Sequence, residues 1–368
     1  MKALIIDSFD FYKLRSRYVY DGLKCLGYDV SIITSDFNHI TKSKQIEERE
    51  NVLYISTKPY KKNISLRRIK SHLDFAKQAI KIVYQENPDI IYCLVPLNSL
   101  VKNIAKYKRL HYTVQVFFDV IDLWPESMPT IGMIKKILFP WRLLRDKYLS
   151  SADKVFLECE YYKQYLPKSI KYSVMYLSKE ERIVNYNSDE VLRFLYLGSI
   201  NNIIDINCIV ELLALINKKR LIHLEIIGGG EKSTELTLKL DAAGVQYTNH
   251  GIIFDENTKD EIISRCQFGL NMYKKGLCIG LTMKSIDYFS RGLPIVSNNI
   301  YDTDLIIDRY QCGISITKEG FASTIEKLSN MTDKEWMKMH ENAMHAYSDL
   351  FIPVNTMNEF KLCVKKSK

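Results

Sequence analysis

Lys284 and Asp287, one helical turn apart, are the residues whose types and spacing most clearly suggest chemistry. They lie in residues 281–296, LTMKSIDYFSRGLPIV, a segment that predicts a short helix, a Gly-Leu-Pro stop and a buried strand. Thr282 is expected to cap the helix, whose first turn would then offer backbone N–H groups and Lys284 to a phosphate. Asp287 could accept two hydroxyls of a ribose. An ordinary α/β helix with a solvated lysine and aspartate would have the same local sequence.

Glycines follow two more predicted strands in the same half of the chain. Gly198 and Ser199 follow the apolar run LRFLYL, and three consecutive glycines at 228–230 follow a strand that ends at Ile227. The carboxyl ends of parallel strands meet at one edge of a sheet, and glycine lets the backbone approach a ligand closely. We therefore expect these strand ends to converge with residues 273–284 on one binding site.

A second candidate site follows the strand at 112–118, in the sequence DVIDLWPESMP. Asp122 and Glu126 lie where α/β proteins bind ligands, and they are the candidates for a general base or for contacts with sugar hydroxyls. Trp124, followed by a proline, would give this loop a rigid apolar anchor. The alternative is a capping loop, with Asp122 as an N-cap and Glu126 in the first helical turn.

The elements that must position these residues alternate between buried strands and helices. The runs ALII, PDIIYCLV and YTVQVFF are continuous apolar strands separated by helical spacing, which indicates a parallel sheet covered on both faces. The loop after the first strand reads SFDFYKLRSR, so the glycine-rich dinucleotide fingerprint is absent. Arg15 and Arg17 in this loop could bind an anion or form a solvated face.

The strand–helix pattern restarts after a polar segment at 167–190, which predicts two domains. The fold class is α/β, with two Rossmann-like, doubly wound parallel-sheet domains and a cleft between them. We expect domain bounds of 1–171 and 172–350, with a final helix at 351–368 packing back toward the N-terminal domain.

Composition excludes several other classes of protein. The chain has 368 residues, of which 46% are hydrophobic and 26% charged, as in globular proteins. Its eight cysteines are scattered through mostly apolar runs without a CxxC pair, so we expect reduced thiols. The first apolar run is too short for a signal peptide, and no window approaches about 18 apolar residues, so no membrane span is expected.

Charge is distributed unevenly between the two halves. Residues 1–171 hold 29 lysines and arginines against 18 acids, whereas residues 172–368 hold 23 against 25. Six basic and no acidic residues lie in 58–70, and the helix expected at 131–149 mixes basic with large apolar residues. Such helices bind anionic membrane surfaces, although a core-packing helix with a solvated basic face fits too. The expected membrane-surface residues are Lys135, Lys136, Trp141, Arg142 and Arg145.

Taken together, these segments resemble the GT-B glycosyltransferases, in particular the large retaining family numbered four. The resemblance covers nearly the whole chain. Its most specific parts are FLYLGS, LEIIGGGEK, VQYTNHGII and TMKSIDYFSRGLPIV, together with the DLWPES loop, which is typical of a subgroup that builds capsule, exopolysaccharide or O-antigen chains.

The resemblance implies site residues on both domains. Asp122 and Lys284 take the catalytic roles, and Trp124 and Glu126 lie on the acceptor side. Asp287 is the ribose carboxylate. The donor-binding residues are expected to be Gly198, Ser199, Gly228, Gly229, Gly230, Lys232, Gly251, Ile252, Lys274, Thr282 and Asp287.

The sequence also departs from the family pattern. The first glutamate of the family motif is Ile279 here, and the ribose carboxylate is an aspartate where glutamate is usual. The Arg…Lys pair after the first strand of the C-terminal domain is missing, so Lys284, Lys232 or the pair Lys274 and Lys275 would have to neutralise the donor diphosphate.

The implied activity is transfer of a sugar, with retention, from a nucleoside-diphosphate sugar, preferably a UDP-sugar, to a lipid-linked saccharide. No cofactor and no metal is expected, because lysines and helix N-termini would stabilise the leaving diphosphate. The expected partners are the sugar donor, the lipid-linked acceptor and an anionic membrane surface, but not nucleic acid; a homo-oligomer stays open. The expected location is cytoplasmic, at the inner face of the cell membrane.

Other functions fit parts of the same sequence. A non-catalytic GT-B partner of another transferase would explain the lost glutamate and the missing Arg…Lys pair. A protein O-glycosyltransferase would share the fold and differ in its acceptor, and a nucleotide-sugar epimerase would share the architecture. The sequence Asp302-Thr303-Asp304 matches the DxD motif of the other sugar-transferase fold, but its place after a strand indicates a helix cap.

Overall fold

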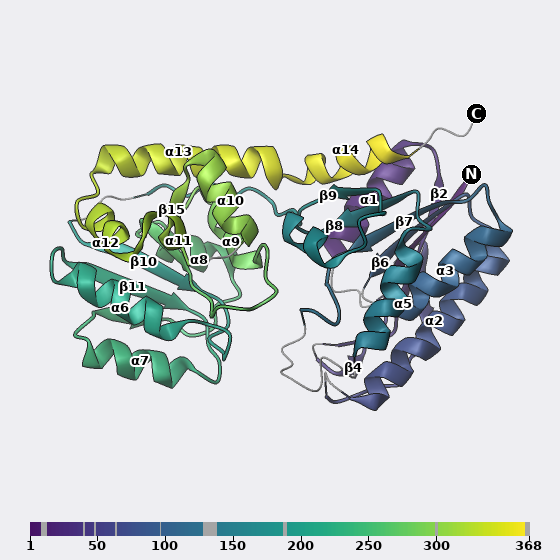
Figure 1. The fold of residues 1–368 in the computed structure, drawn as a ribbon, viewed down its shortest axis with the longest axis horizontal. Helices are drawn as coiled ribbons and strands as arrows, with labels where there is room; N and C mark the ends of the chain where they lie inside the picture. Colours follow the sequence, from purple (N-terminus) through teal and green to yellow (C-terminus); the bar gives the residue numbers. More distant parts are fainter. Residues whose placement is uncertain are drawn as a thin grey trace. The chain divides into compact units, whose positions relative to one another are not determined.

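The computed structural model describes residues 1–8, 13–39, 41–47, 49–62, 65–95, 97–127, 138–186, 190–298 and 301–364. It divides into two compact units (Figure 1): unit 1 contains Met1–Leu177 and Pro353–Lys368, and unit 2 contains Ser178–Ile352. The sequence predicts a boundary between residues 171 and 172. The structure has it after Leu177, because residues 172–174 form one more parallel strand of the unit 1 sheet.

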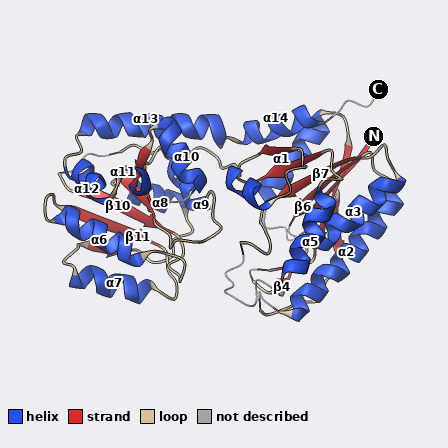
Figure 2. Ribbon diagram, viewed as in Figure 1, coloured by secondary structure: helices blue, strands red, loops and turns tan. Residues whose placement is uncertain are grey.

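The described part of unit 1 contains a parallel sheet of seven strands in the order β5-β2-β1-β6-β7-β8-β9 (Figure 2). Every residue of β6 is buried, as its continuous apolar sequence predicts for a strand covered on both faces. The strands are β1 (Lys2–Asp7), β2 (Asp29–Ser35), β5 (Val52–Ile55), β6 (Ile90–Val95), β7 (Gln115–Val120), β8 (Lys154–Leu157) and β9 (Tyr172–Val174). An antiparallel pair, β3 (Phe37–Asn38) and β4 (Ser43–Lys44), lies outside this sheet.

Helices cover both faces of this sheet. The helices α2, α3 and α5 lie side by side, and α1 packs with α14 (Figure 1). The ring of Phe360 on α14 lies 5.3 Å from that of Tyr92 and 5.5 Å from that of Phe117, so the C-terminal helix completes the unit 1 core. The helices are α1 (Lys13–Cys25), α2 (Leu66–Glu86), α3 (Asn98–Leu110), α5 (Phe139–Leu149), the 3₁₀ helix η1 (Glu160–Tyr165) and α14 (Pro353–Cys363).

A buried ion pair lies inside unit 1. The Arg15 guanidinium on α1 donates to both carboxylate oxygens of Asp119, at 2.8 and 3.1 Å, and to the carbonyl oxygen of Tyr176 at 2.7 Å. The hydroxyl of Tyr92 donates to the same carboxylate. Arg15 is only 2% exposed, so both sequence-based interpretations of this residue, anion binding and a solvated face, are wrong. The face of α1 that carries Arg15 is turned inward, toward an acid on β7.

The described part of unit 2 contains a second parallel sheet, in the order β12-β11-β10-β13-β14-β15 (Figure 2). Its strands are β10 (Leu192–Leu197), β11 (Ile222–Ile227), β12 (Tyr247–Asn249), β13 (Phe268–Asn271), β14 (Ile295–Ser297) and β15 (Gly313–Ser315). The helices are α6 (Ile206–Asn217), α7 (Ser233–Ala242), α8 (Glu256–Ile263), α9 (Met283–Phe289), α10 (Tyr301–Tyr310), α11 (Ile316–Glu319), α12 (Phe321–Ser329) and α13 (Asp333–Leu350).

The two sheets share one topology. In each, the first strand lies inside the sheet, the second and third strands follow on one side, and the later strands follow on the other. This confirms the prediction of two doubly wound, Rossmann-like parallel sheets. The strand order reverses between β1 and β6 in unit 1 and between β10 and β13 in unit 2, and ligands of such folds bind beyond the carboxyl ends of the strands there.

No helix of the described residues is both long enough and apolar enough to cross a membrane.

Candidate functional site

The predicted cap of α9 is present, but its hydroxyl is used inside the protein. Thr282 Oγ1 accepts a hydrogen bond from the backbone N–H of Ser285 at 3.2 Å and lies 2.9 Å from the hydroxyl of that residue. Asn271 at the end of β13 donates to Ser285 Oγ at 2.6 Å. Because α9 has only seven residues, its dipole is weak, and any attraction for phosphate depends mainly on Lys284.

Lys284 is a buried cation beside the end of β10. Its Nζ lies 4.4 Å from the ring centroid of Tyr196 and 4.8 Å from that of Tyr273, two cation–π contacts that partly replace hydration. The residue is 9% exposed, and burial lowers the pKa of its ammonium group to about 7. A Cβ added to Gly198 would lie 4.0 Å from Lys284 Cε, which places the lysine against the first glycine-marked strand end.

The glycines after β10 and β11 bring two loops of unit 2 into backbone contact. The N–H of Gly198 donates to Ile227 O at 2.8 Å, and the N–H of Gly228 donates to Gly251 O at 2.7 Å. A Cβ at Gly228 would lie 1.9 Å from the Gly198 carbonyl oxygen, and one at Gly230 would lie 2.4 Å from the Ile200 oxygen. These two glycines are therefore required by loop packing, whether or not a ligand also approaches them.

This contact predicts the effect of a methyl group at Gly228. Its φ of +153° and the overlap with Gly198 O should make Gly228→Ala cost about 3 kcal/mol of folding free energy, measured by calorimetric unfolding. The control is Gly244→Ala, which has φ +67° and open space around its Cβ, and which should cost about 1 kcal/mol. Equal stability of the two variants would contradict the packing argument.

Asp287, the predicted ribose carboxylate, forms ion pairs in the structure. Its Oδ1 pairs with Lys179 Nζ and lies 3.4 Å from Arg291 Nη1. The buried Arg291 also pairs with Asp260 at 2.7 Å and Glu256 at 2.6 Å. Burial lowers the pKa of Lys179 to about 8. Lys179 was not among the residues expected from the sequence, because it lies in a polar segment without a motif.

The remaining predicted donor residues have varied surroundings. Lys232 pairs with Glu235 at 2.7 Å, and Lys274 is exposed. The carbonyl oxygen of Ser199 accepts a hydrogen bond from Tyr196 at 2.8 Å. Ile252 is 67% exposed and borders Gly229, where an added Cβ would lie 3.3 Å from it. The structure thus brings together one group of predicted residues: Gly198, Gly228, Gly229, Gly251, Ile252 and Lys284.

Asp122 follows β7 at the carboxyl end of the unit 1 sheet. Trp124 Nε1 donates to its Oδ2 at 2.5 Å, and the hydroxyl of Ser127 donates to its Oδ1. Burial raises the pKa of Asp122, while these hydrogen bonds and the nearby Arg68 act to lower it. No helix begins at Asp122 in residues 121–127, all of them described, so the capping alternative is wrong.

Trp124 is the centre of a stack that the sequence did not reveal. The Arg68 guanidinium lies 4.1 Å from the ring centroid of Trp124, and the His72 ring stacks at 5.7 Å with an interplanar angle of 20°. Arg68 Nε donates to His72 Nε2 at 3.3 Å. Burial and the charge of Arg68 lower the pKa of His72 to about 3, so the imidazole is neutral and can accept this hydrogen bond.

Glu126 and Arg145 form a salt bridge in unit 1. The two Arg145 Nη atoms lie 2.9 and 3.1 Å from the carboxylate oxygens of Glu126. The Arg145 side chain is fully buried, so the prediction that it lies on a membrane-facing surface is wrong. Arg142 pairs with Glu126 and Asp146, both at 3.2 Å. Trp141 is half-buried, and Lys135 and Lys136 lie outside the described residues.

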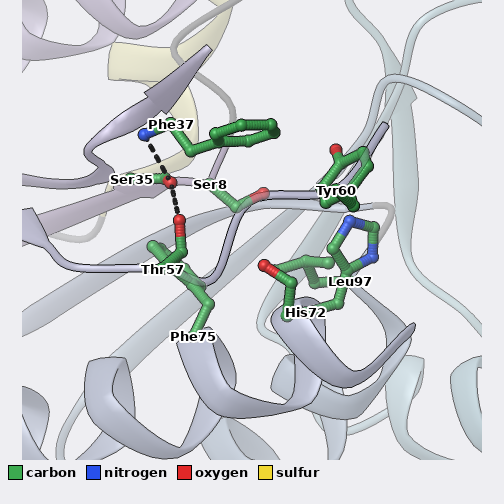
Figure 3. Close-up of a pocket in the computed structure, with 9 residues that line it drawn as sticks. Ser8, Ser35, Phe37, Thr57, Tyr60, His72, Phe75 and Leu97 are labelled. Atoms are coloured by element: carbon green, nitrogen blue, oxygen red, sulfur yellow. Dashed lines mark hydrogen bonds between the residues drawn. The ribbon is translucent and has the colours of Figure 1, made fainter. Parts of the chain in front are cut away.

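A pocket opens at the carboxyl edge of the unit 1 sheet (Figure 3). Side chains from β2, β3 and α2, from the segments that follow β1 and β5, and from the residue before α3 line it: Ser8, Ser35, Phe37, Thr57, Tyr60, Ser71, His72, Phe75 and Leu97. This pocket was not expected from the sequence. The basic, aromatic stretch at 58–70 was its signal, but that stretch was interpreted as membrane-binding.

Among the described residues, no group of His, Cys, Asp and Glu side chains could hold a metal ion. Asp302 and Asp304 are buried in the first turn of α10, and Asp304 Oδ2 accepts a hydrogen bond from Ser315 at 2.7 Å.

Comparison with known proteins gives similarity in structure only. No protein-family model and no curated protein matches the sequence. Sucrose-phosphate synthase from Thermosynechococcus elongatus matches with a TM-score of 0.70 at 12% identity, over 98% of both chains. The lipopolysaccharide outer core galactosyltransferase WaaB matches with a TM-score of 0.70 at 14% identity, over 98% of this chain and 99% of that one. Anabaena HepE, solved with UDP and glucose, matches with a TM-score of 0.67 at 11% identity, over 98% of both chains.

The fold is GT-B. These matches span both units, so the GT-B assignment covers nearly the whole chain. At such low identity they establish the fold alone. The GT-B architecture explains why two sheets of the same strand order occur in one chain, and why candidate residues gather at the carboxyl edge of each.

Proposed function

We propose that this protein is a glycosyltransferase that moves a sugar from a nucleoside-diphosphate sugar to a lipid-linked saccharide in the synthesis of a surface polysaccharide. The observation that carries the proposal is the buried Lys284 ammonium beside Gly198 at the carboxyl edge of the unit 2 sheet. Within the described part of the chain, this nearly dehydrated cation contacts the rings of Tyr196 and Tyr273 and the Tyr196 hydroxyl, and no carboxylate pairs with it. A diphosphate would supply the negative charge.

The donor is best taken as a UDP-sugar. HepE, a protein of the same fold, was solved with UDP, with UDP-glucose, and with UDP and glucose. In the proposed complex Lys284 neutralises charge on the leaving diphosphate, and the loops of Gly198 and Gly228 bring backbone close to it. Asp287 would accept the ribose hydroxyls while Lys179 and Arg291 hold its carboxylate in place.

The acceptor hydroxyl is assigned to the side of Asp122. The hydrogen bonds from Trp124 and Ser127 fix this carboxylate, so it can orient a sugar hydroxyl. By analogy with retaining enzymes of this fold, we expect the donor diphosphate to take the acceptor proton and the reaction to need neither metal nor cofactor. The Glu126–Arg145 salt bridge would hold the loop that contains Asp122 in place.

A membrane surface is the proposed location of the acceptor. On α5, Phe139 and Leu143 lie one turn apart and are 52% and 51% exposed. At the start of α2, Leu66 is 84% exposed and lies beside the exposed Arg67 and near the exposed Lys70. Exposed apolar groups among basic residues are the pattern of helices that bind anionic lipid surfaces.

The membrane proposal predicts the effect of two substitutions on α5. Phe139→Ser with Leu143→Ser should weaken binding to vesicles containing anionic lipid by about tenfold or more, because both side chains would lose burial in the lipid. Sedimentation with vesicles at low and high salt measures this. The control is Leu238→Ser on α7, a leucine of unit 2 that is 62% exposed. Unchanged binding by the α5 variant would mean that another surface is used.

The proposed function is tested by incubating the protein with UDP- and GDP-sugars and short lipid-diphosphate saccharides, and detecting transfer by mass spectrometry. We expect a sugar to be added to the lipid-linked acceptor with at least one donor. Absence of both transfer and donor hydrolysis with every donor would refute catalysis.

A non-catalytic GT-B subunit is the second candidate. It is favoured by Ile279, which stands where the family motif has a glutamate. Calorimetry with UDP and GDP separates the two functions: no nucleotide binding together with a stable complex with another transferase supports the subunit. Transfer to a peptide instead of a lipid would identify a protein glycosyltransferase.

A further inference from the structure

Three basic side chains, Lys42, Arg68 and His72, gather around the ring of Tyr60 at the unit 1 pocket. Lys42 Nζ lies 5.0 Å from the Tyr60 ring centroid, the Arg68 guanidinium 5.6 Å, and the His72 ring 6.1 Å in an edge-on contact. Lys42 Nζ also donates to the backbone carbonyl oxygen of His39, whose imidazole feels the charges of Arg68 and Lys42. Figure 3 shows the Tyr60 and His72 rings together on one side of the pocket.

Lys42 and Arg68 are the charged members of this group. Burial, followed by the charge of Arg68, lowers the pKa of Lys42 and lowers the pKa of His39 to about 4, so the His39 imidazole is neutral. Burial lowers the pKa of Arg68, whereas Tyr60 and Asp122 act to raise it. The two cations are the groups with which an anionic ligand at the pocket could pair.

Two buried hydroxyl groups of the same pocket have no acceptor for their hydrogens. Tyr60 and Ser8 are each 3% exposed; Ser8 Oγ has no hydrogen-bond partner, and Arg68, the side chain that acts on Tyr60 OH, can only donate to it. In Figure 3 the Ser8 oxygen points toward the Tyr60 side of the pocket. By contrast, Ser35 and Thr57, also in the lining, satisfy each other at 2.8 Å. A buried hydroxyl without an acceptor lowers the stability of the fold, so both groups would gain a hydrogen bond from a ligand that offers an acceptor atom.

The start of α3 adds to the same site. Leu97 lines the pocket and precedes the first residue of this 13-residue helix without giving it a side-chain cap. Ser99 Oγ, in the first turn, is buried and also lacks a hydrogen-bond partner. The positive end of α3 thus borders the pocket, as in sites that bind phosphate or carboxylate.

We propose that this pocket binds an anionic group, a phosphate or a carboxylate, carried by the acceptor. Arg68 and Lys42 balance its charge, and the hydroxyls of Tyr60 and Ser8 donate to its oxygens. Because Arg68 stacks on Trp124, which donates to Asp122, the bound anion lies a short chain of contacts from the residue assigned to the acceptor hydroxyl. That the anion belongs to the acceptor rests on the proposed function, whereas anion binding by the pocket does not.

The test is binding of four probes to the full-length protein at constant ionic strength, measured by calorimetry: glucose 6-phosphate, glucuronate, inorganic phosphate and glucose. We expect the anionic sugars to bind and glucose not to bind. Binding of inorganic phosphate as tight as that of glucose 6-phosphate would identify phosphate alone as the recognised group. Equal binding of glucose and the anionic sugars would overturn the proposal.

Variants locate that binding in the pocket. Tyr60→Phe removes only a buried hydroxyl whose hydrogen has no acceptor, so it should not lower the melting temperature and should weaken anion binding about 10- to 100-fold. Arg68→Met should abolish binding, whereas Arg67→Met, the exposed neighbour on α2, should leave it intact. Anion affinity unchanged in Tyr60→Phe, or equally lost in Arg67→Met and Arg68→Met, would overturn the site.

UDP binding to the same variants separates this inference from the proposed function. If UDP binds and sugar transfer occurs but the anions do not bind, the pocket assignment is wrong and the function stands. If anions bind with the expected sensitivity to Tyr60→Phe but no donor is used, the anion site stands without the transferase activity.

Discussion

Replacing Asp119 by asparagine should lower the free energy of unfolding of unit 1 by about 3–5 kcal/mol. The substitution removes the negative charge that faces Arg15. Because the Arg15 side chain is only 1% exposed, water cannot solvate its guanidinium in place of the lost carboxylate. Burial alone would lower the pKa of Arg15, but Asp119 and Tyr92 raise it instead, so the guanidinium stays charged in the interior at any ordinary pH. An unpaired charge in that position is the reason for the large effect.

Urea unfolding followed by tryptophan fluorescence measures this, since Trp124 and Trp141 belong to unit 1 and Trp336 can be replaced by phenylalanine. The control is Glu86→Gln, which breaks a 3.0 Å ion pair between partly exposed side chains and should cost less than about 1 kcal/mol. A triple variant, Arg15→Met with Asp119→Leu and Tyr92→Phe, should be less destabilised than Asp119→Asn, because no polar group is left unpaired. The opposite order would show that the charge is not the cause.

Replacing Lys284 by methionine should weaken UDP binding about 10- to 100-fold, the scale of a hydrogen bond to a charged group. Methionine keeps the length and the contact with the rings of Tyr196 and Tyr273, so the fold should persist. Lys239→Met on α7 is the matched control, a lysine of unit 2 that bonds Glu235 and Asn207 at the surface. Equal affinities of the two variants would remove Lys284 from the donor site.

The low pKa of Lys284 adds a pH dependence with a defined sign. With a pKa of about 7 in the free protein, the amine loses its charge as the pH rises above 7, whereas the diphosphate complex needs the ammonium. UDP binding must therefore take up a proton, and affinity should fall by up to tenfold for each pH unit above 7. Calorimetry in two buffers of different ionisation enthalpy detects the uptake. In Lys284→Met the proton uptake centred near pH 7 should be lost, and any uptake that remains near pH 8 is assigned to Lys179.

The fold was predictable because its signals are local. Continuous apolar runs such as the one that forms β6 could only be strands covered on both faces, and the restart at LRFLYL marked the second sheet. The domain boundary was less accurate because β9 is three residues long and its burial is only partial. So short a strand is defined by its pairing with β8, which local sequence does not encode.

The candidate site was predictable only in part, because its partners are distant in the chain. Thr282 as a cap follows from its neighbours, but the burial of Lys284 depends on Tyr196, 88 residues earlier. Arg145 has an unremarkable amphipathic context, and only the fold brings it to Glu126. For the same reason the stretch 58–70 fits a solvated or lipid-facing surface equally well, and only the stack with Trp124 reveals that Arg68 turns inward.

The packing of α14 has a consequence for the order in which the protein can be made. Phe360 fills the aromatic core formed by Tyr92, Phe117 and Phe156, yet the ribosome adds it after every residue of unit 2. Domains generally fold as units during synthesis, N-terminal first. Here unit 2 can finish folding before unit 1. The aromatic surface of the unit 1 sheet stays uncovered until α14 leaves the exit tunnel.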